Sequence, residues 1–331
     1  MSSQPLYRQF AAALGIRVPI FQAPTGSIAG PELAIAVCRA GAMGAMALTW
    51  MDGEAAAEHV RTVLREAGGP FLVNYALAFP PRSLRAALDA GAPVVSFSWG
   101  DPSEYVANVR SAGARLGIQV TSAEGARRAL QHAPDFLICQ GVEAGGHVQA
   151  TRSLDAALAD VLEAASGIPV VAAGGMGDGA AMAAALNAGA SAVMLGTRFV
   201  ATRESRAHLE YKRLLVEASE ADAVLTVCFD GGWPYAAHRV LRNSTLEAWE
   251  AAGCPQAGVR PGEGDVVGAG ADGADIARYE DTAPRAGFVG EIEAMCCYAG
   301  TSCGAVHDVP PVAELVPRLW RDCEAALARL A

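Results

Sequence analysis

The chain has 331 residues, which is long enough to bury a sizeable core in one large domain or two ordinary ones. Its 52% hydrophobic and 18% charged residues are typical of a compact protein, and its formal net charge of −10 argues against nucleic acid as a partner, since phosphate binding needs a basic surface. The first ten residues lack the pattern of a signal peptide, and the uncharged stretch 179–197 is too weakly apolar for a membrane span, so we expect a cytoplasmic protein with reduced cysteines.

Short apolar runs recur along the first two thirds of the chain, and most are apolar on both faces, as parallel strands covered by helices are. Between them lie Ala-rich amphipathic stretches such as 53–68, 102–117 and 123–133, which predict helices. The predicted strands are, in chain order, 19–24, 43–49, 71–77, 94–100, 117–122, 135–141, 168–175 and 191–197.

Eight such units at a spacing of roughly 25 residues match the length of a (β/α)8 barrel, whereas a doubly wound open sheet is the competing α/β architecture. Similar Ala-Gly-Ala turns precede several strands, and no early Gly-x-Gly-x-x-Gly fingerprint follows the first strand. We therefore expect an α/β fold of the TIM-barrel type.

The pattern changes after residue 218, where Gly, Pro and Asp become frequent and the hydrophobic periodicity is lost until a final amphipathic helix over 310–330. Aromatic residues such as Trp233 and Trp249 favour a folded segment over a linker. The sequence thus predicts a barrel over 1–218 and a C-terminal Gly/Pro-rich extension over 219–331, packed on the barrel as a lid or rim and ending in a closing helix.

In a TIM barrel the active face is made by the strand ends and the loops that follow them. The last two strands end in "AAGGMGDG" (172–179) and "LGTRF" (195–199). Glycines allow a ligand to approach the backbone, and a helix that begins near Asp178 would aim its N–H groups at the pocket. The alternative is that these glycines only make tight turns. The predicted phosphate site consists of Gly174, Gly175, Gly177, Gly196 and Thr197.

The chemistry available around such a site is restricted. The single lysine, Lys212, lies on a predicted helix, so Schiff-base chemistry has no lysine at a strand end. No P-loop and no Gly-x-Ser-x-Gly elbow occurs, and the histidine and carboxylates near strand ends come mostly from separate loops, which argues against a metal site. A phosphate-bearing organic cofactor such as FMN remains.

His147 follows the sixth predicted strand directly after Gly145 and Gly146. A lone histidine is often structural, but at the end of a barrel strand, among small residues, it is a candidate catalytic base. A pKa near neutrality would suit proton abstraction from a carbon acid. The other histidines lie on predicted helices or in the extension and rank lower, with His238 slightly above the rest.

Four segments in this order resemble the nitronate monooxygenase family: 19–44, "QGVEAGGH" (140–147), "AAGGMGDG" (172–179) and "MLGTRFVATRES" (194–205). A fifth, "AMCCYAGTSCGAV" (294–306), is similar to the Gly-rich C-terminal segment of that family. The resemblance covers the whole barrel. Related quinone reductases and a flavin-type enoyl-acyl-carrier-protein reductase share the same signature.

The resemblance implies a TIM barrel that binds FMN and oxidises alkyl nitronates or nitroalkanes with O2 to a carbonyl compound and nitrite. His147 matches the family's catalytic histidine, which would deprotonate a nitroalkane or orient a bound nitronate. The flavin ring would pass the first strand's loop, and the phosphate would lie at the last two loops. By position, the implied FMN-binding residues are Ala23, Pro24, Thr25, Gly26, Asn74, Gln140, Gly145, Gly174, Gly175, Met194, Leu195, Gly196 and Thr197.

The sequence departs from the family in three places. Thr25 stands where a methionine is common, "VQAT" (148–151) follows His147 where many members have Arg-Gly, and no strand-end lysine is present to stabilise negative charge at flavin N1. An arginine, a helix N-terminus or His147 would have to replace that lysine. These departures bear on the substrate rather than on FMN.

The alternative enzyme is an NAD(P)H-dependent FMN reductase acting on a quinone or an enoyl thioester. A non-catalytic flavin- or phosphate-binding barrel is a further hypothesis, which His147 disfavours. A lyase or isomerase acting on a phosphorylated sugar is another, and it would predict a colourless protein. We expect a nitronate or nitroalkane and O2 as small-molecule partners, and we expect binding to neither nucleic acid nor a membrane. Use of NAD(P)H and formation of a homodimer are left open.

Overall fold

The computed structural model describes residues 4–330, so residues 1–3 and 331, at the ends of the two predicted parts, lie outside the described residues. Eight parallel strands form one sheet in the order β1-β9-β8-β6-β5-β4-β3-β2. All eight predicted strands are confirmed. They are β1 (Ile20–Gln22), β2 (Gly44–Ala47), β3 (Phe71–Ala76), β4 (Val94–Ser98), β5 (Arg115–Val120), β6 (Phe136–Gln140), β8 (Val170–Ala173) and β9 (Ala192–Leu195).

The sheet closes into a barrel between its two edge strands. Phe21 in β1 pairs in parallel with Met43, which directly precedes β2. The Gln22 N–H donates to the Met43 carbonyl at 2.9 Å, and the Met43 N–H donates to the Ile20 carbonyl at 2.9 Å. The predicted TIM barrel is therefore confirmed.

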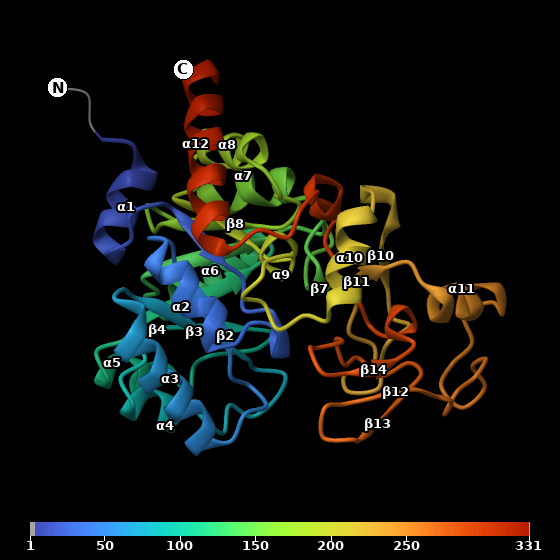
Figure 1. Cartoon of the computed structure of the whole chain (residues 1–331). Helices are drawn as coiled ribbons and strands as arrows, with labels where there is room; N and C mark the ends of the chain where they lie inside the picture. Colours follow the sequence, from blue (N-terminus) through green and yellow to red (C-terminus); the bar gives the residue numbers. More distant parts are fainter. Residues whose placement is uncertain (1–3, 331) are drawn as a thin grey trace.

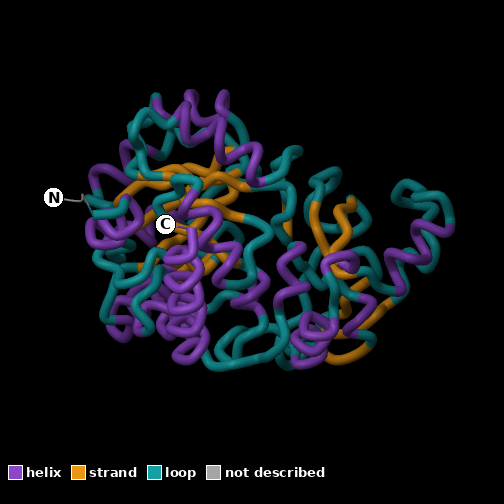
Figure 2. The backbone as a smooth tube through the Cα atoms, turned by 90° about the horizontal axis from the view of Figure 1, so that it is seen from above, coloured by secondary structure: helices purple, strands orange, loops and turns teal. Residues whose placement is uncertain are grey.

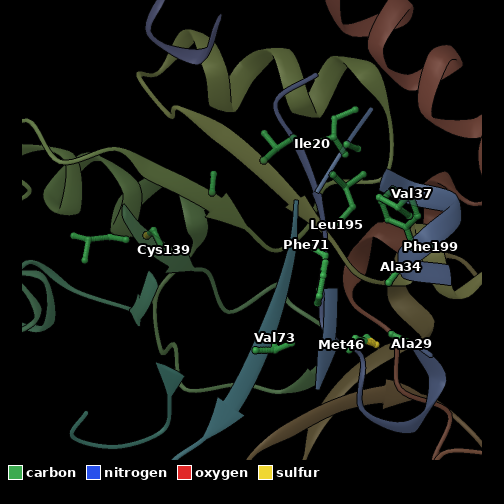
Figure 3. Close-up of a cluster of buried hydrophobic side chains, with 14 of the residues drawn as sticks. Ile20, Ala29, Ala34, Val37, Met46, Phe71, Val73, Cys139, Leu195 and Phe199 are labelled. Carbon is green, nitrogen blue, oxygen red and sulfur yellow. The ribbon is translucent and has the colours of Figure 1, made fainter. Parts of the chain in front are cut away.

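Alternation along each strand separates two cores, because successive side chains point to opposite faces. In β1, Ile20 packs outward against the helices and Phe21 inward. Phe10 on α1 (Leu6–Leu14) stacks on Phe21 and meets Phe136 edge-on at 5.9 Å, so α1 covers the lower end of the barrel interior. Figure 3 shows part of the outward core, where Ile20, Phe71 and Leu195 lie among helical side chains.

Helices connect the strands and cover the sheet. One differs from expectation: α5 spans only Val106–Ser111, because Gly113 takes a left-handed φ of 71° and β5 already begins at Arg115. The connecting helices are α2 (Pro31–Arg39), α3 (Gly53–Ala67), α4 (Leu84–Asp89), α5, α6 (Ala123–Leu130), α7 (Leu154–Ala164) and α8 (Gly179–Asn187).

The C-terminal extension folds beside the barrel and then returns to it (Figures 1 and 2). It contains two small antiparallel sheets, of which one, in the order β10-β11-β7, takes in the loop after β6. The remaining elements of the described chain, inside and outside the extension, are β7 (Gly146–His147), α9 (Thr197–Val200), α10 (Leu209–Glu217), β10 (Ala223–Thr226), β11 (His238–Leu241), α11 (Ser244–Ala251), β12 (Val266–Ala269), β13 (Asp275–Ala277), β14 (Val289–Gly290) and α12 (Val312–Leu330), with short 3-10 turns at Gly26–Ile28, Glu220–Asp222, Ile292–Ala294 and Thr301–Ala305.

The closing helix α12 packs against α8 and α2, in the place of an eighth barrel helix (Figure 1). Its apolar side chains, including Leu315 and Leu319, belong to the same core as the barrel strands. A Cβ on Gly179 in α8 would lie 2.5 Å from the Cys323 nitrogen, so the two helix backbones touch. The barrel is thus completed by the last helix of the extension, while the division at residue 218 stays a prediction.

Candidate active site

A cavity of about 630 Å³ lies at the carboxyl ends of the barrel strands, beneath the extension. Strand ends and extension both line it, with Asn74 from β3 on one side and Tyr298 from the extension on another. The predicted site residues that line the cavity are Ala23, Pro24, Thr25, Gly26, Asn74, Gln140, Gly145, His147, Gly174, Gly175, Met194, Gly196 and Thr197.

Leu195 and Gly177 are the predicted site residues that do not line the cavity; Gly177 packs instead on Ser302, whose carbonyl oxygen would lie 2.8 Å from a Cβ at residue 177. Leu195 is buried elsewhere. Its side chain is 1% exposed and packs in the outward core close to Phe199 (Figure 3). Its carbonyl oxygen accepts a hydrogen bond of 2.8 Å from the Ala23 N–H. Leu195 therefore supports the loop after β1 through its backbone, because strand alternation points its side chain away from the barrel axis.

The glycines after β8 have the conformations that a close backbone approach requires. Gly174 and Gly175 have φ values of 119° and 70°, a region that side-chain-bearing residues rarely adopt. The first turn of α8, in contrast, does not line the cavity, although its N–H groups were predicted to point there. The Asp178 carboxylate caps the Ala181 N–H at 2.8 Å, and the next residue, Gly179, packs on α12. The helix that begins at the cavity is α9, after Gly196.

Close packing explains why residue 145 is a glycine. A Cβ there would clash with the Gly300 nitrogen and lie 2.6 Å from the Ala299 carbonyl carbon. The Gly300 N–H in turn donates to the Thr197 hydroxyl at 2.9 Å. The loops after β6 and β9 are thus held together by the segment around Gly300, which sequence reasoning placed only by resemblance.

Gln140 uses its buried amide to fix the loop that carries His147. Its Oε1 accepts from the Gln149 N–H at 2.9 Å, and its Nε2 donates to the His147 carbonyl at 3.3 Å. Gln149 continues the network, since its Oε1 accepts from Gln119 at 2.7 Å and from the Trp99 N–H at 3.2 Å. The network sets the position of His147 relative to the cavity.

His147 lies in β7 and pairs with His238 of β11. Its Nε2 is buried and has no hydrogen-bond partner within residues 4–330. The ring lies 4.4 Å from the Trp233 ring at an interplanar angle of 31°, and 5.7 Å from the ring of Tyr298. An unpartnered imidazole nitrogen at a cavity wall is available to a ligand.

The expected near-neutral pKa of His147 is wrong for this structure. Burial, and then the proximity of His238, lower the pKa of His147 to about 3, because the protonated ring would lose its hydration and face a second imidazole. Burial also lowers the pKa of His238, whose Nε2 accepts from the Phe229 N–H at 3.2 Å and whose Nδ1 lies 2.9 Å from the Ala236 carbonyl. Both rings are therefore neutral at pH 7.

Aromatic side chains of the cavity wall were missed from the sequence. They come from four separate segments and join only in the fold: Trp50–Phe79 ring centroids are 5.4 Å apart, Phe79–Trp233 5.0 Å, and Trp233–Trp99 4.6 Å. Trp99 has a φ of 61°, unusual for a bulky residue and a mark of local strain. No periodicity signals such a convergence, although each of these residues follows or adjoins a predicted strand end or lies in the extension.

The charged groups of the cavity are few. Arg285 is the only Lys or Arg among the described residues that line it, and Asp281 is the only Asp or Glu. Burial raises the pKa of the Asp281 carboxyl. Lys212 lies on α10 as predicted, and its ammonium donates to the Ser205 carbonyl at 2.8 Å, outside the cavity wall.

The cavity fits a polar, phosphate-bearing ligand on two counts. Three residues that line it carry a buried polar atom without a partner in the described chain, namely the Thr25 hydroxyl, His147 Nε2 and Arg285 Nε. A Cβ on Gly196 would lie 3.5 Å from the Ala23 Cβ, so the loops after β9 and β1 approach each other with only glycine between them. A volume of this size is usual for a cofactor site.

Three further observations concern residues 4–330. No group of three or more His, Cys, Asp or Glu side chains in this part is arranged to hold a metal ion. None of its helices is both long and apolar enough to cross a membrane. All eight cysteines are free, and all but Cys254 are buried.

Residues 79–322 match the sequence profile of the family described as nitronate monooxygenase. A nitronate monooxygenase of Pseudomonas aeruginosa is 35% identical over 67% of this chain and 77% of the relative. A (3aS,4S,5R,7aS)-5-hydroxy-7a-methyl-1-oxo-octahydro-1H-indene-4-carboxyl-CoA dehydrogenase of Mycobacterium tuberculosis is 34% identical over 72% of this chain, and the match spans 66% of that relative.

The fold has a close counterpart among solved structures. A nitroalkane oxidase of Streptomyces ansochromogenes superposes with a TM-score of 0.78 and 29% identity, over 98% of this chain and all of that one. The matched profile covers most of the chain, including β4 to β9 and the extension. The chain therefore belongs to the nitronate monooxygenase family of flavin-dependent oxidoreductases.

Proposed function

We propose that the protein binds FMN and oxidises alkyl nitronates with O2 to a carbonyl compound and nitrite. The observation that carries the proposal is His147, whose Nε2 is buried at the cavity wall and has no partner in residues 4–330. The family match and the nitroalkane oxidase of similar fold support the reaction class.

FMN would accept electrons from the nitronate and pass them to O2. The glycines Gly174 and Gly175, with Gly196 and Thr197 on the neighbouring loop, are suited to its phosphate, because they leave backbone N–H groups and open space at the cavity. Ala23 to Gly26 and Asn74 would contact the rest of the cofactor, and the free hydroxyl of Thr25 offers it a hydrogen bond.

The low pKa of His147 favours one of its two expected roles. A neutral imidazole whose conjugate acid has a pKa of about 3 is a weak base for a nitroalkane carbon. It can still hold a nitronate that arrives already as the anion, through a hydrogen bond at the ring edge. We therefore propose the nitronate, rather than the neutral nitroalkane, as the form that this chain turns over.

The second candidate function is reduction by NAD(P)H of a quinone or enoyl thioester. The relative described as a carboxyl-CoA dehydrogenase, 34% identical, supports it, since that enzyme acts on a thioester. The two functions differ in whether NAD(P)H reduces the bound cofactor quickly. A cytoplasmic location and a homodimer stay predictions.

An anaerobic absorbance titration of the purified protein distinguishes these functions. We expect a yellow protein whose flavin bands bleach or change with ethylnitronate alone. Rapid bleaching by NADPH, with no response to ethylnitronate, would favour the reductase. A colourless protein that does not take up FMN would contradict both.

A further inference from the structure

One wall of the cavity is a continuous row of aromatic rings. Trp50 contacts Phe79, Phe79 contacts Trp233, and Trp233 contacts both Trp99 and His147, with centroid distances between 5.4 and 4.4 Å. All of these residues line the cavity. Such a wall offers a large, rigid apolar surface on which a planar ring can stack, far more than a two-carbon nitronate covers.

Trp233, which lies in the extension, is the central residue of this wall. The preceding residue, Gly232, lies against Asp281: a Cβ on Gly232 would be 2.5 Å from the Asp281 carboxylate. Asp281 in turn begins the segment that reaches Arg285 four residues later, a span of at most about 14 Å. The aromatic wall is therefore linked through Asp281 to the segment that carries Arg285, and both line the same cavity.

Arg285 has the properties of an anion-binding residue. It makes no ion pair with any residue of the described chain, and its Nε is buried without a hydrogen-bond partner. Its guanidinium carbon lies 5.1 Å from the centre of the Phe288 ring, which orients the planar group. A buried guanidinium nitrogen without a partner is costly, and an anionic ligand would supply that partner.

The contacts of Arg285 differ from those of the proposed phosphate loops. Gly174 and Gly175 lie against Ala144 and Glu143 of the loop after β6. Arg285 instead pairs with Ala207, beside the start of α10. Arg285 thus contacts a different segment from the one that packs on Gly174 and Gly175, which leaves it for a second anionic group.

We propose that the substrate of this protein is a planar aromatic molecule that carries an anionic group, with the ring on the aromatic wall and the anion on Arg285. The inference rests on the proposed function for the turnover of such a molecule but not for its binding. Trp233 determines the preference for a ring, and Arg285 determines the preference for an anion.

Isothermal titration calorimetry on the FMN-loaded protein tests the proposal without requiring turnover. The probes are 2-naphthoate, its neutral analogue 2-naphthalenemethanol, and acetate as an anion without a ring. We expect 2-naphthoate to bind about tenfold more tightly than 2-naphthalenemethanol, and acetate to show no measurable binding at millimolar concentration.

Variants test whether Arg285 causes the preference for an anion and Trp233 the preference for a ring. Arg285→Met should remove the tenfold preference and leave the Kd of 2-naphthalenemethanol within about twofold, whereas Arg127→Met, an exposed charge on α6, should bind like the wild type. Trp233→Ala should weaken both aromatic probes by about tenfold, and Trp233→Phe should restore most of the loss. Phe79→Ala serves as a second wall variant if Trp233→Ala fails to fold.

Three outcomes would overturn the proposal: binding of acetate as tight as that of 2-naphthoate, an unchanged naphthoate preference in Arg285→Met, or loss of FMN from Arg285→Met. The last would assign Arg285 to the cofactor phosphate. Inactivity toward every nitronate, with the predicted binding pattern intact, would instead contradict the proposed function alone.

Discussion

His147 and His238 face each other across the antiparallel pair β7–β11, with ring centroids 5.5 Å apart. One ring comes from the loop after a barrel strand and the other from the extension, so the extension sets the environment of the candidate catalytic residue. Burial lowers the pKa of both rings, and the proximity of His238 further disfavours a positive charge on His147.

This arrangement predicts a loss of stability in acid. An unfolded histidine binds a proton near pH 6.5, whereas folded His147 stays neutral down to about pH 3. Between these values the unfolded state binds more protons, so the free energy of unfolding falls as the pH falls. At pH 5 the part due to His147 is about 2 kcal/mol. Urea unfolding at pH 7 and pH 5 should show a smaller fall for His147→Gln, and equal falls would contradict a neutral His147.

Removal of the imidazole should affect turnover and leave the cofactor in place. We expect His147→Ala to keep its FMN and to lose about 100-fold in kcat/KM for ethylnitronate, since a positioned acid–base or hydrogen-bonding group commonly contributes that much. His307→Ala, an exposed histidine outside the cavity, is the matched control. Full activity of His147→Ala would show that the ring has no part in the reaction.

A carboxylate at the proposed phosphate loop should expel the cofactor. Gly175→Asp would place a negative charge there and would also strain a backbone with a φ of 70°. Gly175→Ala carries the same strain without the charge, so comparison of their FMN dissociation constants isolates the electrostatic effect. We expect the Asp variant to bind FMN at least about tenfold more weakly than the Ala variant. Equal constants would place the phosphate elsewhere.

Gln140 is expected to act on the loop rather than on the cofactor. Gln140→Leu leaves the Gln149 N–H without its partner and frees the His147 carbonyl, at a cost of about 1–3 kcal/mol in unfolding free energy. Activity per bound FMN should fall, while FMN content stays near that of the wild type. Loss of FMN with normal activity per bound flavin would instead support a direct contact between Gln140 and FMN, as the family resemblance implies.

Close packing of α8 on α12 should be sensitive to a single added side chain. Gly179→Val would drive its side chain into the backbone of Cys323 and Asp322, so we expect a loss of about 1–3 kcal/mol in unfolding free energy. Ala180→Val, on the exposed side of the same helix, is the control. A Gly179→Val protein as stable as the control would mean that α12 contributes little to the barrel.

The sequence by itself determined the barrel and most of the cofactor side of the cavity. Parallel strands that are buried on both faces have continuous apolar sequences, so they can be recognised from the sequence. Because the residues after these strands share one end of the barrel, strand order alone brings Asn74, His147 and Gly174 to one cavity. The glycines with positive φ after β8 could also be predicted, because local backbone geometry restricts the residue type at such positions.

Only the tertiary structure decided the properties that depend on contacts between distant segments. The low pKa of His147 arises from burial under Trp233 and from His238, 91 residues later in the chain, neither of which a strand-end pattern encodes. The aromatic wall, the isolation of Arg285 and the return of α12 to α8 likewise depend on how the irregular extension folds back. Such segments lack hydrophobic periodicity, so their partners are set by packing and desolvation across the whole fold rather than by local sequence.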